Sequence, residues 1–374
     1  MPSVNRRAFF GACAAGAAAS SPTAATPVAA LSQAPAAGAA APTPSPEQRL
    51  LTLIDGAAVT QMIYVAARTR VADHIGAGSP SVDEIAAATK VHPDSLYRVL
   101  RTLAGYGVFE ELEGRRFRQT PVSRLLQGDV PRSMRAAAEV RGEDFFWRSW
   151  GALRDSVRTG ETGHELVFGE DTFTWFARHP DQARLFDDFQ ASMTAAAATA
   201  ITKAYPFPPS ATVADIGGGN GTLLTAVLGA HPGVKGVLFD LPHVVDAARP
   251  RLAAQAARLQ FTGGDFFKAV PAGAQIYLMK YIIHDWEESK ALAILANTRR
   301  AMPGGAHLLV IEDLVCGPNQ PCRAKLGDVN MLVRTGGRNR TREEYDALLA
   351  RGGFRIERAI PAAGDLHILD AVVV

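Results

Sequence analysis

The segment VADIGGGNGT, at residues 213–222, decides the fold. In it an apolar run ends in Asp215 and a cluster of glycines, and an apolar, helix-like stretch follows. A second apolar run, VLFDLP at residues 237–242, ends in another acid, Asp240. Glycines let the backbone approach a bound ligand, and an acid after the second strand accepts hydrogen bonds from ribose hydroxyls. Together the two segments predict a pocket for an adenosine-containing cofactor in a parallel α/β sheet.

Apolar runs alternate with helical patterns from Thr212 to the end of the chain. The runs lie at residues 213–216, 237–239, 259–261, 276–279, 308–311, 354–360 and 366–374. This alternation predicts a Rossmann-like, doubly wound α/β sheet within a domain at residues 206–374. Ligands of such sheets bind at the carboxyl ends of the strands, where most of the candidate residues lie.

Residues 47–130 predict a separate small helical domain. Ser81 precedes Asp83 and Glu84 and is typical of a helix start. A second helix is expected over residues 92–100, followed by two short extended runs around a Glu-Gly turn. Helix, turn, helix and hairpin together are typical of a winged-helix domain.

Winged-helix domains serve either DNA binding or dimer packing. The second helix carries only Arg98 and Arg101 among apolar residues, and the formal net charge of the chain is +2. A protein dedicated to nucleic acid is usually more basic. Dimer packing is therefore the favoured interpretation, and a ligand-sensing winged-helix regulator is the weaker alternative.

Residues 1–46 differ in composition from the rest. Arg6 and Arg7 precede an uncharged, Ala-rich run, which resembles a twin-arginine export signal, and an Ala/Pro-rich disordered linker is expected to follow. A wrongly assigned start or a disordered tail is the alternative. The apolar run is too short for a membrane-spanning helix, so no stable membrane insertion is expected. The predicted location is the periplasm if the signal acts, and otherwise the cytoplasm.

Two further regions allow only coarse predictions. Residues 131–205 predict a helical connector rich in aromatic residues, most of them for packing and a minority for a pocket that takes a flat, apolar substrate. The three cysteines, Cys13, Cys316 and Cys322, form no zinc-binding pattern, and no metal is expected. A Cys316–Cys322 disulfide is possible in an oxidising compartment, but two unpaired loop thiols are favoured.

The glycine turn and the two strand ends after it define the expected cofactor site. Gly217, Gly219 and Gly221 have a tighter spacing than the turn of dinucleotide enzymes, so no pyrophosphate need be held. Asp240 is placed to bind the ribose; its alternative role is to cap the following helix. Asp265, after the third strand, can accept a hydrogen bond from an adenine amino group, and Phe266 can pack on that ring. A surface turn is the alternative for Asp265.

His284 follows the fourth strand and is the main candidate for catalysis. Imidazole titrates near neutrality, so it can take a proton from a hydroxyl group. Asp285 and Trp286 lie beside it, and Glu312 ends the next strand. A carboxylate there can orient the imidazole and stabilise its protonated form.

Several segments, in this order, resemble the S-adenosylmethionine-dependent O-methyltransferases of the caffeic-acid type and their bacterial relatives. They are VADIGGGNGT, FDLPHVV, GGDFF, YLMKYIIHDWEESKALAIL, AMPGGAHLLVIEDLV and GGRNRTREEYDALLARGGF, and the resemblance covers roughly residues 47–374. It implies S-adenosylmethionine as cofactor, a methyltransferase sheet, and an intertwined homodimer through the N-terminal domain. The residues expected to bind the cofactor are Asp215, Gly217, Gly219, Asp240, Leu241, Asp265, Phe266 and Lys280.

The resemblance also implies functions for residues near the acceptor. His284 is then the general base and Glu312 supports it, while Met193 lies beside the substrate ring, with Asp285 and Trp286 as further contacts. The expected substrate is a small hydroxylated molecule, aromatic or polyketide-like.

One position departs from the family pattern. Where many members carry Glu in a GG-[KR]-E-R-T segment, this chain has Asn339. Asn339 can hydrogen-bond His284 but cannot neutralise its positive charge, so the base is expected to be weaker or the substrate hydroxyl more acidic. The family also contains members that catalyse hydroxylation or decarboxylation, and these reactions are the alternative to methyl transfer.

Overall fold

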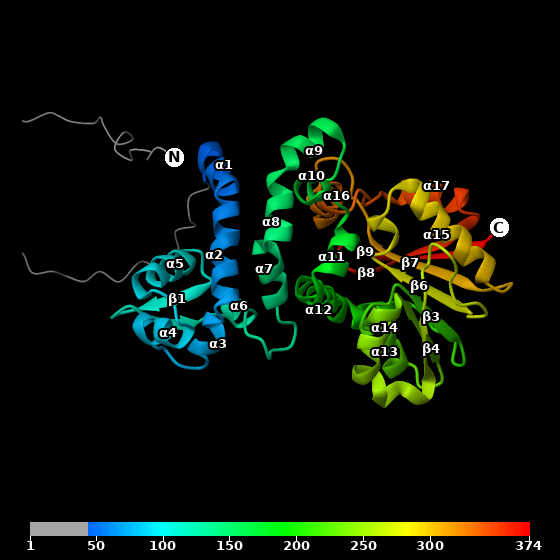
Figure 1. Cartoon of the computed structure of the whole chain (residues 1–374), viewed down its shortest axis with the longest axis horizontal. Helices are drawn as coiled ribbons and strands as arrows, with labels where there is room; N and C mark the ends of the chain where they lie inside the picture. Colours follow the sequence, from blue (N-terminus) through cyan, green and yellow to red (C-terminus); the bar gives the residue numbers. More distant parts are fainter. Residues whose placement is uncertain (1–43) are drawn as a thin grey trace, which may run out of the picture. The chain divides into compact units, whose positions relative to one another are not determined.

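The computed structural model describes residues 44–374 (Figure 1), so the predicted export signal and Cys13 lie outside the described residues. The chain divides into two compact units, one up to Leu51 and the other Thr52–Val374. Helix α1 (Pro46–Ile54) begins in the first unit and ends in the second. All other described elements belong to the second unit.

The N-terminal part of the second unit contains the predicted helices and hairpin. Its elements are α2 (Gly56–Arg68), α3 (Val71–Ile75), α4 (Val82–Thr89), α5 (Pro93–Gly105), β1 (Phe109–Leu112), β2 (Arg116–Gln119) and α6 (Pro121–Arg124). Ser81 and Glu84 form a reciprocal capping box that starts α4, and His92 caps α5 ahead of Pro93. Strands β1 and β2 pair antiparallel. The two helix starts and the hairpin were therefore predicted correctly.

The connector is helical throughout, as expected. It comprises α7 (Arg135–Gly142), α8 (Asp144–Gly151), α9 (Leu153–Thr159), α10 (Gly163–Phe168), α11 (Thr172–Arg178) and α12 (Pro180–Ala204). Its core contains Val140, Phe145, Trp175 and Phe176. A Cβ on Gly142 would lie 2.0 Å from the ring of Tyr64, so only glycine lets α7 pack this closely on α2.

A seven-stranded sheet forms the C-terminal part, in the order β5-β4-β3-β6-β7-β9-β8. The strands are β3 (Thr212–Ile216), β4 (Lys235–Asp240), β5 (Leu259–Gly263), β6 (Ile276–Lys280), β7 (His307–Asp313), β8 (Phe354–Ala363) and β9 (Leu366–Val373). All seven predicted runs are strands. β9 runs antiparallel to both β7 and β8, and all other neighbouring pairs are parallel. The Rossmann-like prediction is confirmed.

Helices cover both faces of the sheet (Figure 1). They are α13 (Thr222–Ala230), α14 (Pro242–Ala248), η1 (Arg249–Arg258), η2 (Ile283–Asp285), α15 (Glu288–Ala301), α16 (Arg323–Arg334) and α17 (Arg342–Arg351). Alternate residues of each central strand enter different cores: Val213 packs with α12 and α13, whereas Ala214 packs with α15 and α17. The strands are thus buried on both faces, as parallel strands usually are.

The strand order reverses at β3, which has β4 on one side and β6 on the other. The connections leaving β3 and β6 therefore diverge to opposite sides and open a crevice at their carboxyl ends. The glycine turn follows β3, Asp240 ends β4 and His284 follows β6. The topology thus brings the candidate residues to one edge of the sheet.

The cysteine prediction was wrong, because Cys316 and Cys322 form a disulfide. The loop between them turns back so that the two Cα atoms are 6.2 Å apart, within the range that a disulfide requires. Cys322 directly precedes α16, so the bond fixes the chain where this helix begins.

Within residues 44–374, no individual helix has the length and apolarity needed to cross a membrane. The consecutive helices α1 and α2 meet that criterion only when they are taken together as a bent pair.

The capping box at Ser81 gives a stability prediction. Ser81→Ala removes the side-chain acceptor of the Glu84 amide and should lower the free energy of unfolding by about 0.5–2 kcal/mol. Thr102→Ala is the control, because that exposed hydroxyl bonds only the Arg98 carbonyl of its own helix. Denaturant unfolding measures both variants. Equal losses would show that the cap contributes nothing specific.

Candidate active site

The glycine turn is held against the end of β4. The amides of Gly217 and Gly218 both donate to the Phe239 carbonyl, at 2.8 and 3.2 Å. Gly217 has φ +69°, and a Cβ there would lie 2.5 Å from Ile282. A side chain is therefore excluded both by the backbone conformation and by the neighbouring loop. The turn presents bare backbone to the crevice.

Asp240 faces this turn. Its Oδ2 accepts from the Gly219 amide at 2.8 Å, and its Oδ1 accepts from the Leu241 amide at 2.7 Å. Leu241 is the N-cap of α14, and this cap has no side-chain hydrogen bond. Asp240 therefore does not cap the helix by its side chain. Its carboxylate is fixed beside the glycines, in the place where ribose hydroxyls bind in folds of this kind.

Asp215 lies behind the turn and is buried. Its Oδ2 has no hydrogen-bond partner, and a Cβ on Gly218 would lie within 3 Å of its carboxyl group. Burial, with a smaller contribution from the charge of Asp240, raises the pKa of Asp215 to about 7. A buried oxygen without a partner and glycines that leave no space for side chains fit a ligand that binds at this edge.

Phe266 approaches the turn from the loop after β5. Its ring lies 3.7 Å from where a Cβ on Gly217 would be, and it packs edge-on against Phe267 and Trp286. Asp265 accepts a hydrogen bond from the Phe267 amide at 2.9 Å, so its carboxylate also stabilises its own turn. An aromatic face and an acid therefore flank the side of the crevice where an adenine ring is expected.

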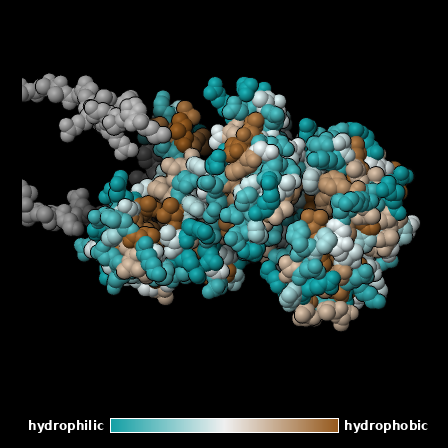
Figure 2. Space-filling model, in the orientation of Figure 1, coloured by the Kyte–Doolittle hydropathy of each residue, from teal (hydrophilic) through white to brown (hydrophobic). Residues whose placement is uncertain are grey.

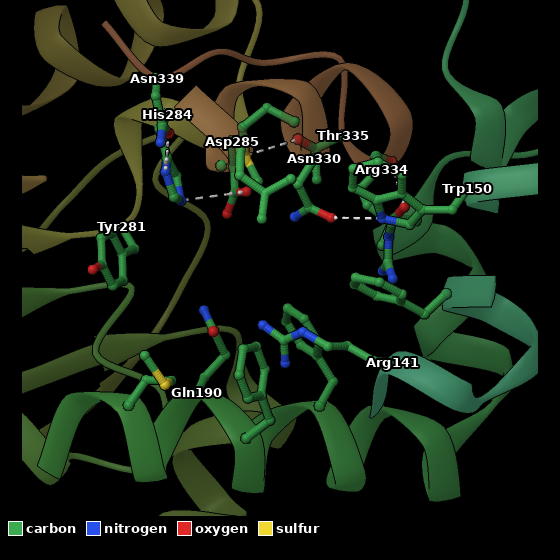
Figure 3. Close-up of a pocket in the computed structure, with 18 of the residues that line it drawn as sticks. Arg141, Trp150, Gln190, Tyr281, His284, Asp285, Asn330, Arg334, Thr335 and Asn339 are labelled. Atoms are coloured by element: carbon green, nitrogen blue, oxygen red, sulfur yellow. Dashed lines mark hydrogen bonds and ion pairs between the residues drawn. The ribbon is translucent and has the colours of Figure 1, made fainter. Parts of the chain in front are cut away.

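His284 lies in the loop after β6, and Figure 3 shows its ring between Asn339 and Asp285. Its Nδ1 is 2.9 Å from Asn339 Oδ1 and 3.3 Å from Glu312 Oε2. Its Nε2 is 3.7 Å from Asp285 Oδ1. The Asn339 amide group donates to the Ala324 carbonyl, so its oxygen must face the imidazole. Nδ1 therefore carries the proton, and Nε2 is left with its lone pair.

Burial sets the protonation state of this pair. It lowers the pKa of His284 to about 4, although the hydrogen bond to Asn339 acts in the opposite direction. Burial also raises the pKa of Glu312 well above its usual value. Glu312 Oε1 accepts from the His284 amide and so also holds the loop. The imidazole is neutral at physiological pH and can accept a proton, but its protonated form is only weakly stabilised.

Tyr281 was not among the predicted site residues. Its ring stacks on His284 at 5.1 Å, its hydroxyl donates to Asp313, and Lys280 Nζ lies 3.7 Å from its centroid. Tyr281 has φ +55°, which is unfavourable for a bulky residue and is found mainly where function requires it. Its position directly after β6 was the signal in the sequence that could have identified it.

Lys280 ends β6, directly before the loop that carries Tyr281 and His284. Its Nζ donates to Thr194 on α12 at 3.2 Å. Burial lowers the pKa of Lys280 to about 8, although the neighbouring acids oppose this shift. The lysine is therefore mostly a cation at neutral pH, held between α12 and the strand ends.

A cavity of about 610 Å³ opens in front of His284, a size that suits a compact organic molecule. Met193 and Asp285 line it, as predicted for substrate contacts, and so does Asn339. Its aromatic wall comprises Phe146, Trp147, Trp150, Phe173, Phe186, Phe189 and Tyr281. Trp286 does not line the cavity. Its ring stacks on Phe173, which does line the cavity, at 4.9 Å between centroids, and its contact with the substrate stays a prediction.

Polar side chains on the connector and on α16 complete the cavity. Trp150 donates from its indole nitrogen to Asn330 at 3.2 Å, and Arg141 and Arg334 also line the wall. Neither arginine was among the predicted site residues. Nothing in the sequence marks them, because only the fold shows that α7 and α16 face one cavity.

Comparison with known families supports this geometry. An O-methyltransferase domain model matches residues 150–355, and an O-methyltransferase dimerisation domain model matches residues 51–129. The first match contains the glycine turn, His284, Glu312 and Asn339. The second contains the predicted helices and hairpin.

Individual relatives agree with these matches. The chain is 42% identical to a phenazine O-methyltransferase of Lysobacter antibioticus, over 86% of this chain and 95% of that protein. The structure of a mitomycin 7-O-methyltransferase matches with a TM-score of 0.82 and 34% identity, over 88% of this chain and 98% of that chain.

A third relative was crystallised with its ligands. It is an O-methyltransferase from neocarzinostatin biosynthesis, in complex with S-adenosylmethionine and 2-hydroxy-5-methyl naphthoic acid. It matches with a TM-score of 0.76 and 30% identity, over 87% of this chain and 98% of that chain. With its glycine turn, its helical dimerisation domain and these relatives, the chain belongs to the S-adenosylmethionine-dependent O-methyltransferases.

Proposed function

We propose that this enzyme methylates a hydroxyl group of a flat aromatic or polyketide-like molecule, with His284 as the general base. The observation that carries the proposal is the neutral imidazole, which lines a cavity walled by aromatic rings. Such walls favour planar, apolar ligands by stacking. The neocarzinostatin relative, crystallised with a naphthoic acid, supports the same class of substrate.

The proposed cofactor contacts surround the glycine turn. Asp240 would bind the ribose hydroxyls and Phe266 would pack on the adenine ring, with Asp265 accepting from the adenine amino group. Further contacts are proposed for Asp215, Gly217, Gly219, Leu241 and Lys280. Their support is the bare backbone of the turn, the fixed Asp240 carboxylate and the unpartnered oxygen of Asp215.

Bound S-adenosylmethionine supplies an activated methyl group, so the protein mainly has to align the acceptor. The aromatic wall holds the acceptor flat and excludes water, and His284 Nε2 takes the hydroxyl proton. Glu312 and Asn339 keep the ring in one orientation and one tautomer. Alignment can contribute about 7–11 kcal/mol, whereas a general base contributes about 10²–10⁴-fold in rate. Because His284 is a weak base, an acidic phenol suits it best.

The dimerisation domain is proposed to form a homodimer. Helix α1 leaves Leu53 and Ile54 largely exposed, at 77% and 61% of their surface. Figure 2 shows an apolar patch over this helix. Exposed apolar clusters of this kind mark contact surfaces with partners.

Asp240 is tested by cofactor binding. Asp240→Ala removes the proposed ribose acceptor and should weaken S-adenosylhomocysteine binding at least about 10-fold by calorimetric titration. Asp246→Asn is the matched control, because this acid lies on the next helix and pairs only with Arg249. Unchanged affinity in Asp240→Ala would remove Asp240 from the cofactor site.

His284 is tested by the rate of the chemical step. His284→Ala should lower turnover at least about 100-fold while leaving S-adenosylhomocysteine affinity nearly unchanged. The acceptor is 2,6-dihydroxynaphthalene, and the product one methyl group heavier is measured by mass spectrometry. Near-normal turnover would contradict the general-base role, and a hydroxylated or decarboxylated product would contradict methyl transfer.

The Asn339 substitution predicts a pH effect. Asn339→Asp places a carboxylate beside Nδ1, which favours the imidazolium and raises the pKa of His284 from about 4. The acid limb of the kcat/KM profile should therefore move up by at least about one pH unit. Asn319→Asp adds the same charge on an exposed turn and should leave the profile in place. An unmoved acid limb in Asn339→Asp would show that His284 does not control it.

A further inference from the structure

Arg334, at the end of α16, is a buried cation without an anionic partner. Only 3% of its surface is exposed, and its Nε and Nη1 atoms have no hydrogen-bond partner. Its carbonyl oxygen accepts from Thr172. Within residues 44–374 its guanidinium forms no ion pair, and the acid that acts on it through charge is Asp285, which raises the pKa of Arg334 against the effect of burial. A buried charge in a finished structure is normally paired, so this one requires an explanation.

Aromatic rings compensate for only part of this charge. The guanidinium carbon lies 5.0–5.8 Å from the ring centroids of Phe145, Phe146, Phe176 and Phe186. Such contacts favour a cation over the ring faces but satisfy none of its five N–H donors. Burial lowers the pKa of Arg334 to about 10, so the charge persists at neutral pH. Nε and Nη1 are therefore buried donors without a partner, in a residue that lines the cavity.

A second arginine enters the same cavity. Arg141 lies on α7, and Figure 3 shows its guanidinium pointing into the open space. Its Nη1 donates to the Ala137 carbonyl, which uses one of five donors. Within the described chain Arg141, too, forms no ion pair with a carboxylate, and its guanidinium lies over the rings of Phe146 and Phe189.

The acidic residues of the cavity lie toward the catalytic loop. Asp285 is 3.7 Å from His284 Nε2, and Asp313 accepts from the Tyr281 hydroxyl. In Figure 3, His284 and Tyr281 lie on one side of the cavity, and Arg141 and Arg334 lie on the opposite side. One end therefore carries the imidazole, and the other end carries two cations that form no ion pair within the described residues, although the charge of Asp285 acts on Arg334.

We propose that Arg141 and Arg334 bind a carboxylate of the methyl acceptor, so that the substrate is a hydroxylated aromatic acid. The hydroxyl group lies at His284 and the carboxylate at the arginine pair. This assignment rests on the proposed function, because it takes the cavity as the acceptor site. Arginine suits the role, since its planar donors can bind both oxygens of a carboxylate.

Such binding would also align the reacting group. A carboxylate fixed at one end of a rigid ring system restricts both the position and the tilt of the hydroxyl at the other end. Alignment is the main contribution the protein can make to methyl transfer. The arginine pair is thus a specificity device whose loss should affect KM more than kcat for an acidic acceptor.

The test compares two ligands of the same shape, one with a carboxylate and the other with a neutral amide in its place. The probes are 6-hydroxy-2-naphthoic acid and its neutral amide, 6-hydroxy-2-naphthamide, titrated calorimetrically into the full chain saturated with S-adenosylhomocysteine. The native protein should bind the acid about 10–100-fold more tightly than the amide. Equal affinities, tighter binding of the amide, or no binding of the acid would overturn the proposal.

Variants assign this preference to the two arginines. Arg141→Gln and Arg334→Met should each reduce the preference for the acid at least about 10-fold while changing amide affinity little. Arg148→Gln is the matched control, because this arginine is exposed on α8, lies over the ring of Phe168, and is not among the residues that line the cavity. A purely structural role would weaken both ligands equally. If Arg334→Met fails to fold, the affinities of Arg141→Gln for the acid and the amide are sufficient to test the proposal.

The proposed function has its own separate readout. Methylation of neutral 2,6-dihydroxynaphthalene needs no carboxylate, so it can succeed even where the acid shows no preference. Loss of anion selectivity with intact methyl transfer would overturn only the arginine assignment. No methyl transfer to either class, with S-adenosylhomocysteine still bound, would instead contradict the acceptor site itself.

Discussion

The hydrogen bond between His284 Nδ1 and Asn339 Oδ1 is the interaction on which the chemistry of this site depends. It is directional, because the Asn339 amide group is already committed to the Ala324 carbonyl. One end of the imidazole is thereby fixed, and Nε2 is left as the only ring atom with a free lone pair. Burial keeps this ring neutral, and the amide, unlike a second carboxylate, does not oppose that effect with a full charge. If His284 is the base, as proposed, the site orients it for proton transfer but stabilises its protonated form only weakly.

The low basicity of His284 determines how much of the rate enhancement can come from proton removal and how much must come from alignment of the acceptor. Strong bases deprotonate poor acids, whereas a base with a depressed pKa must rely on an acidic acceptor or on proton transfer that accompanies methyl transfer. The position of the acceptor relative to the methyl group then matters more than the basicity of His284, and most residues of the cavity hold the acceptor or the imidazole in place. Tyr281 stacks on the imidazole from a strained backbone conformation, Glu312 holds the loop amide, and aromatic side chains from the connector close the opposite wall. The helical connector is thus as much part of the active site as the sheet.

The features that follow from strand topology could be predicted from the sequence. The glycine turn, Asp240 and His284 follow neighbouring parallel strands, and parallel strands bring their carboxyl ends to one edge. What depended on side-chain direction in loops and helices could not be predicted. Trp286 follows His284 by two residues, yet its ring stacks on Phe173 and does not line the cavity. The spacing of Cys316 and Cys322 was compatible both with free thiols and with the disulfide that the structure contains. Neither outcome is encoded in a period or a motif.

The role of Arg334 likewise could not be predicted from the sequence. Its position on α16 is unremarkable in the sequence, and its meaning appears only when four aromatic rings from the connector surround it and no acid pairs with it. An apolar residue of similar volume would fill this space without the desolvation penalty of a charge. A locally unfavourable residue inside an otherwise consistent core is expected where binding requires it. The aromatic wall and the cation then serve one purpose: the rings hold a planar ligand, and the charge determines which end of that ligand points away from His284.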